Sequence, residues 1–225
     1  MKRVIIASLV AMGIFTAEAQ ALTNIVFYSF NTNGFVGVDQ STAMTNYLQV
    51  ANIGSGISSF SFSNSQATPL LTILSSVTAS PNNHGFPAGN SVGMNGWNGG
   101  ASYFQFTLNA TGFQGLVLAW AGNRSSTGPT NVVLQYSSDG GATFNNFNTF
   151  AAPANVGTTQ DVSAVTALDN NALDVFRIVG VDAAAAGTLK IDNFSIEATA
   201  VPEPSTMLLV GVGVLGMFAI RRRRS

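Results

Sequence analysis

The stretch Asn131–Phe150 reads N-V-V-L-Q-Y-S-S-D-G-G-A-T-F-N-N-F-N-T-F. Its two halves, Asn131–Ser138 and Thr143–Phe150, have the length and composition of β-strands, with aromatic and β-branched residues among polar ones. Between them, Asp139–Gly141 (D-G-G) supplies residues that readily adopt the positive φ angles of a tight hairpin turn. The sequence therefore predicts an antiparallel hairpin, and with it a β fold.

The remainder of the chain between residues 22 and 200 continues this pattern of short strands. No long segment there shows apolar residues at helical spacing, and Gly, Asn, Ser and Thr separate the apolar runs. We expect further strands at Asn24–Phe30, Pro69–Leu74, Tyr103–Leu108, Gly115–Ala121, Leu173–Val181 and Thr188–Ala198, the last two as a pair joined by the loop Asp182–Gly187. Short strands at a spacing of roughly 8–12 residues are typical of a sandwich or barrel.

Three details of these strands follow from their side chains. Phe104, Phe106 and Leu108 alternate with other residues and should share one buried face. The run Gly115–Ala121 is apolar throughout, so we expect burial on both of its faces. Asn193 interrupts the alternation in the last strand, which predicts a β-bulge at that position.

The N-terminus has the pattern of a cleavable secretory signal. Lys2 and Arg3 precede the apolar run Val4–Phe15, which is too short for a membrane anchor but has the usual length of a signal-peptide core. Small residues at Ala19 and Ala21 fit an A-x-A cleavage site. We predict cleavage after Ala21 by the export machinery.

The C-terminus combines a proline-rich motif, an apolar run and a basic cluster. Met207–Ile220 contains no charge and would span roughly 21 Å as a helix, somewhat short of the hydrocarbon core of about 30 Å. With Thr206 included, we predict one transmembrane helix over residues 206–220. Four consecutive arginines follow the helix and should remain cytoplasmic, which places the body of the protein outside. They are Arg221, Arg222, Arg223 and Arg224.

This tail resembles the PEP-CTERM sorting signal of exported proteins from bacteria that make extracellular polysaccharide. The motif Pro202, Glu203 and Pro204, the apolar run and the basic cluster occur here in the order that the family shows. The resemblance implies that an exosortase recognises the tail in the membrane and cleaves it near the motif. We accordingly divide the chain into a signal peptide (1–21), a β-sandwich body (22–198) and a sorting tail (199–225).

Composition excludes two classes of function. Between residues 22 and 203 there are nine acidic residues and three basic ones, a net charge of −6, whereas nucleic-acid binding requires a basic surface. The chain contains no cysteine, which excludes a disulfide framework and thiolate metal sites. Its stability must therefore come from a hydrophobic core.

The body resembles the jelly-roll modules that are appended to secreted bacterial proteins. The matching pieces are Tyr103–Phe106, Ser126–Pro129, Tyr136–Gly141 and Ile191–Phe194. The resemblance implies a jelly-roll type β-sandwich, and many such modules bind carbohydrate while others act as spacers. We therefore predict an all-β, jelly-roll fold for the body.

Two binding sites are suggested by the residues. Trp97 lies in the Gly- and Asn-rich stretch Gly85–Gly100, which we expect to be a loop. With Asn95 and Asn98 it could form a platform for a sugar, or it could be a loop residue folded back on the sandwich. The resemblance to carbohydrate-binding jelly rolls also suggests a structural calcium ion at Asp192, which Asp39 could join. No other cofactor is expected.

Patterns typical of catalysis are weak. Gly89–Gly93 matches G-x-S-x-G, but the histidine of the chain, His84, precedes the serine, and the surrounding composition predicts a loop. Ser137–Phe144 resembles the Asp-box of sialidases, which is a structural turn. Paired carboxylates of a glycoside hydrolase could come from Asp169 with Asp174, or from Asp182 with Asp192.

We therefore predict a protein without enzyme activity that is first anchored in the membrane and then reaches the cell surface or medium. Its expected role is structural or adhesive and linked to exopolysaccharide. The alternative is a lectin-like module centred on Trp97, and a secreted hydrolase is a third reading.

Overall fold

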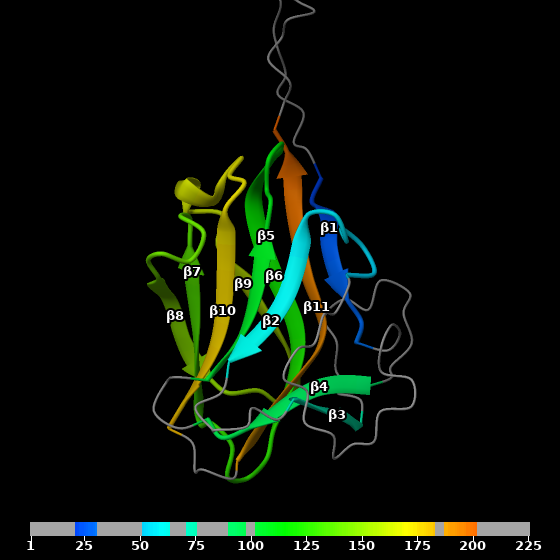
Figure 1. Ribbon diagram of the computed structural model, residues 1–225, viewed down its shortest axis with the longest axis vertical. Coiled ribbons are helices and arrows are strands. Elements are labelled where there is room, and N and C mark those ends of the chain that lie inside the picture. The colour runs from blue at the N-terminus through cyan, green and yellow to red at the C-terminus, as the bar shows by residue number, and fades with distance from the viewer. Residues whose placement is uncertain are drawn as a thin grey trace, which may run out of the picture.

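The computed structural model describes residues 21–30, 51–63, 71–75, 90–97, 102–182 and 187–201. Within them the chain forms two antiparallel β-sheets that pack face to face (Figure 1). The prediction of an all-β sandwich is confirmed.

The strands divide between the sheets as follows. The six-stranded sheet contains β1 (Thr23–Tyr28), β3 (Leu71–Ser75), β4 (Asn90–Asn95), β6 (Phe113–Arg124), β9 (Ala154–Asp161) and β11 (Thr188–Ala200). Its order is β3-β4-β11-β6-β9, and β1 also pairs with β11. The five-stranded sheet contains β2 (Ser58–Ser63), β5 (Tyr103–Leu108), β7 (Asn131–Ser137), β8 (Asn145–Ala151) and β10 (Asp174–Val181), in the order β2-β5-β10-β7-β8. A short 3₁₀ turn, η2 (Thr166–Leu168), precedes β10.

The hairpin predicted from Asn131–Phe150 is confirmed as β7 and β8. Its turn is held by Asp139, whose Oδ1 accepts hydrogen bonds from Ser137 Oγ (2.6 Å) and the Thr143 N–H (2.9 Å). Asp139 Oδ2 accepts a third from Thr143 Oγ1 (2.6 Å). Gly140 and Gly141 adopt φ angles of 76° and 92°, in the region where a Cβ is unfavourable. The Asp-box pattern is thus a structural turn, as predicted.

Replacing Asp139 by alanine should lower the midpoint of thermal unfolding by a few degrees at pH 7. The side-chain hydrogen bonds from Ser137 and Thr143 favour the charged carboxylate and hold its pKa well below the ordinary value of 3.8. The contribution of Asp139 is therefore fully present above about pH 4 and is lost as the pH falls further. Thermal unfolding of both proteins between pH 3 and 8 tests this, with Asp139→Asn as an intermediate because it keeps one acceptor. Equal midpoints at pH 7 would contradict it.

Other strand predictions were only partly correct. The strands predicted at Leu173–Val181 and Thr188–Ala198 exist as β10 and β11, but they are not a hydrogen-bonded pair, because they lie in different sheets. The Gly- and Asn-rich stretch predicted as a loop contains β4, which pairs with β3 and β11. The strands β2 and β9 were not predicted.

The strand β11 organises the six-stranded sheet. Its residues 188–191 pair with β4 and its residues 194–198 with β1, while β6 pairs along the opposite edge. The predicted bulge is confirmed: the register with β6 shifts between Asp192 and Ser195, and Asn193 has a φ of 49°. Because Thr23 pairs with Ala198, the first and last described strands lie side by side, so residues 21 and 201 leave the same end of the body (Figure 1).

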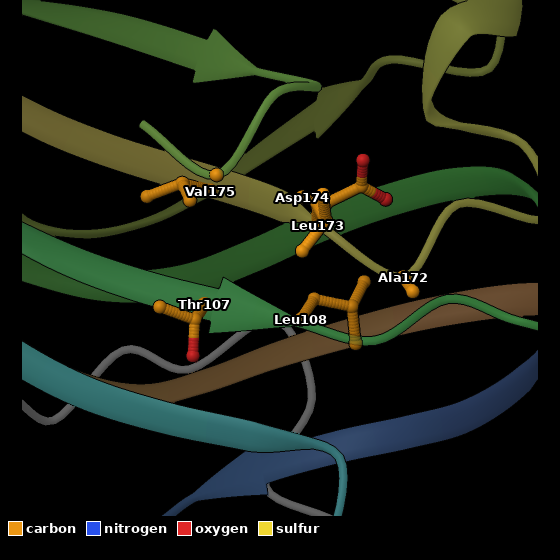
Figure 2. Close-up of a pocket in the computed structure, with 7 residues that line it drawn as sticks. Thr107, Leu108, Ala172, Leu173, Asp174 and Val175 are labelled. Carbon is orange, nitrogen blue, oxygen red and sulfur yellow. The ribbon is translucent and has the colours of Figure 1, made fainter. Parts of the chain in front are cut away.

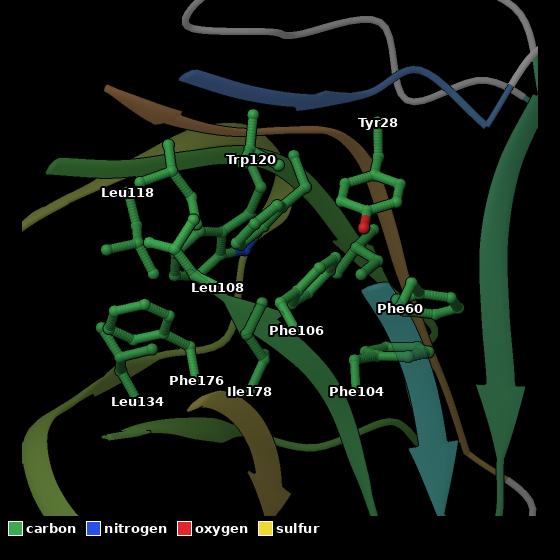
Figure 3. Close-up of a cluster of buried hydrophobic side chains, with 14 of the residues drawn as sticks. Tyr28, Phe60, Phe104, Phe106, Leu108, Leu118, Trp120, Leu134, Phe176 and Ile178 are labelled. Carbon is green, nitrogen blue, oxygen red and sulfur yellow. The ribbon is translucent and has the colours of Figure 1, made fainter. Parts of the chain in front are cut away.

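The core fills the space between the two sheets. Alternate residues of β5 are buried, which confirms the shared face of Phe104, Phe106 and Leu108. Phe106 stacks on Phe194 of the opposite sheet with ring centroids 3.5 Å apart and an interplanar angle of 4°. Figure 3 shows this cluster, in which aromatic and aliphatic side chains from both sheets interdigitate. The centre of β6 is buried on both faces from Leu118 to Gly122, whereas Gly115 and Val117 are half-buried, so the burial expected over Gly115–Ala121 is found in its second half.

Candidate functional site

A row of polar side chains crosses the outer face of the five-stranded sheet. The strand register aligns Ser61 of β2, Gln105 of β5, Arg177 of β10, Gln135 of β7 and Asn146 of β8. Their neighbours in sequence on β5, β10 and β7 are core residues, all buried except the half-buried Tyr136, so the alternation of strand side chains turns this polar row outward. The row therefore presents amide, hydroxyl and guanidinium groups on one side of the sandwich.

Hydrogen bonds tie members of the polar row together. Arg177 Nε donates to Gln105 Oε1 at 2.8 Å, and Gln105 Nε2 donates to Ser61 Oγ at 3.4 Å. On the other side, Gln135 Nε2 donates to Asn146 Oδ1 at 2.9 Å. These bonds restrict the rotamers of the side chains, so the row is pre-organised for hydrogen bonding with a ligand.

Two aromatic rings hold the guanidinium of Arg177. Its Cζ lies 3.9 Å from the ring centroid of Tyr103 and 3.6 Å from that of Phe144. Two rings cannot occupy the same side of a planar group at these distances, so they sandwich it. The Nη2 atom also donates to the Tyr103 hydroxyl at 3.2 Å. We call this unit of Tyr103, Phe144 and Arg177 the Arg177 clamp; it combines cation–π attraction with a fixed guanidinium plane.

The hairpin turn places one half of the clamp. Phe144 follows directly after Thr143, whose N–H and hydroxyl are both fixed by Asp139. The turn at Asp139 therefore fixes the position of Phe144 relative to the five-stranded sheet. The other half, Tyr103, stands on β5 opposite Val179, two residues after Arg177 on β10.

The clamp leaves much of the guanidinium free to bind. Arginine has five N–H donors, and contacts with the described residues use two of them. Arg177 forms no ion pair within the part of the chain that the structure describes. Burial lowers its pKa slightly below the usual range, although the guanidinium remains charged at neutral pH.

A second feature is a pocket of about 230 Å³ where β5 ends and β10 begins. It is lined by Thr107, Leu108, Gly140, Ala172, Leu173, Asp174 and Val175. In Figure 2 the carboxylate of Asp174 points away from the side chains of Thr107 and Leu108. The residue is only 1 % exposed, so its carboxylate is not offered to a ligand in solvent.

Asp174 is a buried acid inside the core layer. It stands opposite Leu108 on the inward face of the five-stranded sheet, and Asn171 Nδ2 donates to its Oδ1 at 2.8 Å. Its Oδ2 accepts no hydrogen bond from the described residues. Burial raises the pKa of Asp174 from its ordinary value of 3.8 to about 7, and the nearby Asp169 adds to the rise. Asp169 itself accepts from the Gly115 N–H at 2.9 Å, which is a loop-closing role.

The predicted sugar platform at Trp97 is not formed. The Trp97 side chain is 0 % exposed; its Nε1 donates to the Met94 carbonyl at 2.6 Å, and its ring meets Phe104 edge-on with centroids 5.2 Å apart. A ring without an exposed face cannot stack on a sugar. Gly180 leaves the space that the ring fills, since a Cβ there would lie 2.5 Å from Trp97 Cε3. The alternative for Trp97, a residue folded back on the sandwich, is correct, and the ring lies within the core.

The other predicted site residues are dispersed. Asn95 is half-buried at the end of β4 and accepts a hydrogen bond from the Thr188 hydroxyl. Asp192 is buried at the bulge of β11, where its Oδ1 accepts from the N–H of Asn193 at 2.8 Å. Asn98 and Asp39 lie outside the described residues, so calcium binding by Asp192 and Asp39 stays a prediction.

The residues of the Arg177 clamp were not singled out from the sequence as a site. Tyr103, Phe144 and Arg177 are far apart along the chain and meet only through strand register. One signal was available: Arg177 is an isolated cation in the predicted strand Leu173–Val181. A cation flanked on both sides by apolar residues within a strand requires a partner on its own face of the sheet.

The C-terminal tail begins beside the body of the protein and matches a known sorting motif. Val201, the last described residue, donates its N–H to the Gly112 carbonyl at 2.8 Å, so the tail leaves the body beside the β5–β6 connection. Residues 200–224 match the PEP-CTERM protein-sorting motif. The PEP-CTERM motif implies an exported protein that an exosortase sorts, as the sequence predicted. The strand β11 extends to Ala200, two residues into the tail predicted from residue 199.

The body resembles solved carbohydrate-binding modules. The tandem CBM22-1–CBM22-2 domain from Paenibacillus barcinonensis Xyn10C matches with a TM-score of 0.51 and 10 % identity, over 84 % of this chain and 49 % of that one. The xylan-binding CBM22-1 domain of the same protein gives 0.49 and 11 %, over 81 % and 99 %. A CBM29-2 variant complexed with mannohexaose gives 0.42 and 14 %, over 80 % and 94 %. At 10 % identity, the likeness to the tandem domain shows the fold alone.

A search of curated proteins finds no match to this sequence. The described residues include no helix with the length and apolar character needed to span a membrane. The predicted transmembrane helix (206–220), the PEP motif at Pro202–Pro204, the basic cluster Arg221–Arg224 and nearly all of the signal peptide lie outside the described residues. Ala21 is exposed and lies two residues before β1 begins, so cleavage after it would leave that strand whole.

Proposed function

We propose that the protein is an exported glycan-binding protein, and that the outer face of its five-stranded sheet is the binding surface. The main observation in support of this proposal is the Arg177 clamp. Sugar recognition needs hydrogen-bonding groups held in fixed positions beside aromatic surface. The polar row supplies the hydrogen-bonding groups, and the rings of Tyr103 and Phe144 supply the aromatic surface. This replaces Trp97 as the centre of the lectin-like alternative.

A glycan ligand would give the exported protein an adhesive role at the cell surface, which joins the two functions considered from the sequence. The fold that the body shares with the tandem CBM22 domain is consistent with this reading. The surface has the character of a binding site without catalysis. The described acids nearest to it are turn and core residues: Asp139 holds the hairpin and Asp174 is buried.

The alanine substitution of Arg177 should weaken binding to the extracellular polysaccharide of the host by at least about tenfold. The substitution removes the charge, two hydrogen bonds and the group that separates the two rings. Affinity electrophoresis in gels containing that polysaccharide measures the change. Arg124→Ala is the matched control, since it removes an arginine from β6 in the other sheet. Equal retardation of wild type and Arg177→Ala would overturn the proposed surface, as would no retardation of wild type.

We also propose that the ends of the chain are processed as the sequence predicts. Cleavage after Ala21 and then near Pro202–Pro204 would release the body, with Arg221–Arg224 left on the cytoplasmic side of the helix 206–220. Intact-mass measurement and membrane fractionation of the protein from its host test this. A species that ends near Pro202 in the wall or medium is expected. A species that keeps the arginines in the membrane fraction would contradict processing.

A further inference from the structure

The strands of the five-stranded sheet, whose outer face is the proposed binding surface, contain two charged residues. They are Asp174 and Arg177, both on β10. Asp174 faces the core and is buried, whereas Arg177 lies in the outward polar row. Among the described strand residues, the formal charge on this outer face is therefore positive, although residues 22–203 carry a net charge of −6. The nearest loop acids are engaged: Asp139 accepts from Ser137 and Thr143, and Asp182 Oδ2 accepts from Asn131 Nδ2 at 3.1 Å.

From this we infer that the Arg177 clamp selects glycans whose sugars carry a carboxylate, such as polyuronates. The inference rests on the proposed function, because it specifies the ligand class of that same surface. The rings fix the plane of the guanidinium, and three of its N–H donors are free of the described residues. Carboxylate oxygens match a planar guanidinium with two parallel, charge-assisted hydrogen bonds, which neutral hydroxyls cannot provide.

Burial of the Arg177 guanidinium strengthens the selection of sugars that carry a carboxylate. The two rings remove water from both faces of the guanidinium, and burial opposes its charge. A neutral sugar would bury the group further without compensating its charge, whereas a carboxylate would supply the missing counter-ion. The negative charge elsewhere on the body does not cancel this gain, because at physiological salt charges beyond about 8 Å are largely screened while a contact pair persists.

Neighbouring side chains complete a site for a sugar unit. Gln105 lies on one side of Arg177 in the polar row, and Gln135 with Asn146 on the other. An amide both donates and accepts, so these groups suit the ring hydroxyls that flank a uronate carboxyl. The exposed faces of such a ligand would remain in water.

Titration calorimetry on the full-length protein in non-ionic detergent tests the inference. The probes are oligogalacturonate, oligomannuronate, and each oligomer after reduction of its carboxyl groups to alcohols. We expect at least one uronate to bind about tenfold more tightly than its reduced form, since charge-assisted hydrogen bonds are about twice as strong as neutral ones. Arg177→Gln should abolish that preference, and Arg177→Lys should restore part of it, because lysine keeps the charge but not the fork. Arg124→Gln, the matched control, should leave it unchanged.

Different binding results distinguish failure of the inference from failure of the proposed function. If a uronate and its reduced form bind equally and Arg177→Gln weakens both, carboxylate selection is wrong and glycan binding stands. Tighter binding of a sulfated oligomer than of the uronate would also overturn carboxylate selection. If no probe binds, carboxylate selection is wrong. The proposed function is then tested by affinity electrophoresis in gels that contain the host polysaccharide. If probes bind but no Arg177 variant changes their affinity, both proposals fail. Unchanged thermal midpoints of the variants, checked first, exclude misfolding as the cause.

Discussion

Replacement of Trp97 by alanine should lower the free energy of unfolding by about 3–5 kcal/mol, the usual cost of deleting a large buried aromatic side chain. Trp97 is fully buried and packs edge-on against Phe104. Its truncation would also leave the Met94 carbonyl without the 2.6 Å hydrogen bond from Nε1. Chemical denaturation of the two proteins, followed by tryptophan fluorescence and circular dichroism, measures the difference.

Two controls separate packing from ligand binding. Trp97→Phe keeps an aromatic ring but loses the hydrogen bond, so it should cost less than Trp97→Ala. Val156→Ala changes a side chain that is 49 % exposed and should shift stability by less than about 0.5 kcal/mol. If Trp97→Ala left stability unchanged and removed glycan binding, the ring would be a surface platform after all, and its buried position would be wrong.

Replacement of Asp174 by asparagine should make the protein more stable at pH 8 by as much as about 4 kcal/mol, the free energy that a rise in pKa from 3.8 to about 7 represents. Burial disfavours the charged carboxylate in the folded protein. The unfolded chain therefore releases its proton at lower pH than the folded protein does. Between about pH 4 and pH 7 the folded state binds more protons, so wild-type stability falls as the pH rises through this range and then levels off.

The asparagine variant should lack this decline. The side-chain amide that Asp174→Asn introduces keeps an oxygen that can accept from Asn171 Nδ2, and it is neutral at every pH. Denaturation at pH 5, 6, 7 and 8 should show the two proteins converging at acidic pH and diverging above it. Asp182→Asn changes the acid that directly follows β10; it is the control, and the difference between wild type and Asp174→Asn should be the same in its background. Parallel curves for wild type and Asp174→Asn would contradict the prediction.

Local features of the fold were predictable where local sequence determines them. The D-G-G turn at Asp139 and the alternation of Phe104 and Phe106 depend on residues within a few positions, and both are confirmed. The bulge at Asn193 is of the same kind. The assignment of β10 and β11 to different sheets depends instead on partners far away in sequence, so a short loop between two strands was misread as a pairing.

The candidate site was harder to predict for the same reason. The sequence around Trp97 is rich in Gly and Asn, which suggested exposure, but the space it occupies is provided by Gly180 on β10. Arg177 of β10 meets Phe144 only because β10 pairs with β7 and the turn after β7 carries Phe144 beside Arg177. Neither relation can be obtained from composition or spacing along the chain.

The position of β11 has a consequence for how an exported chain acquires its structure. This strand joins β1, β4 and β6, yet it is the last strand described along the chain. The strands β1 and β4 therefore lack their shared partner until residues 188–200 arrive, although β3 can already pair with β4 and β6 with β9. In a chain that crosses a membrane from its N-terminus, the six-stranded sheet would be completed only after residues 188–200 have passed. Formation of that sheet would then draw this last strand outward.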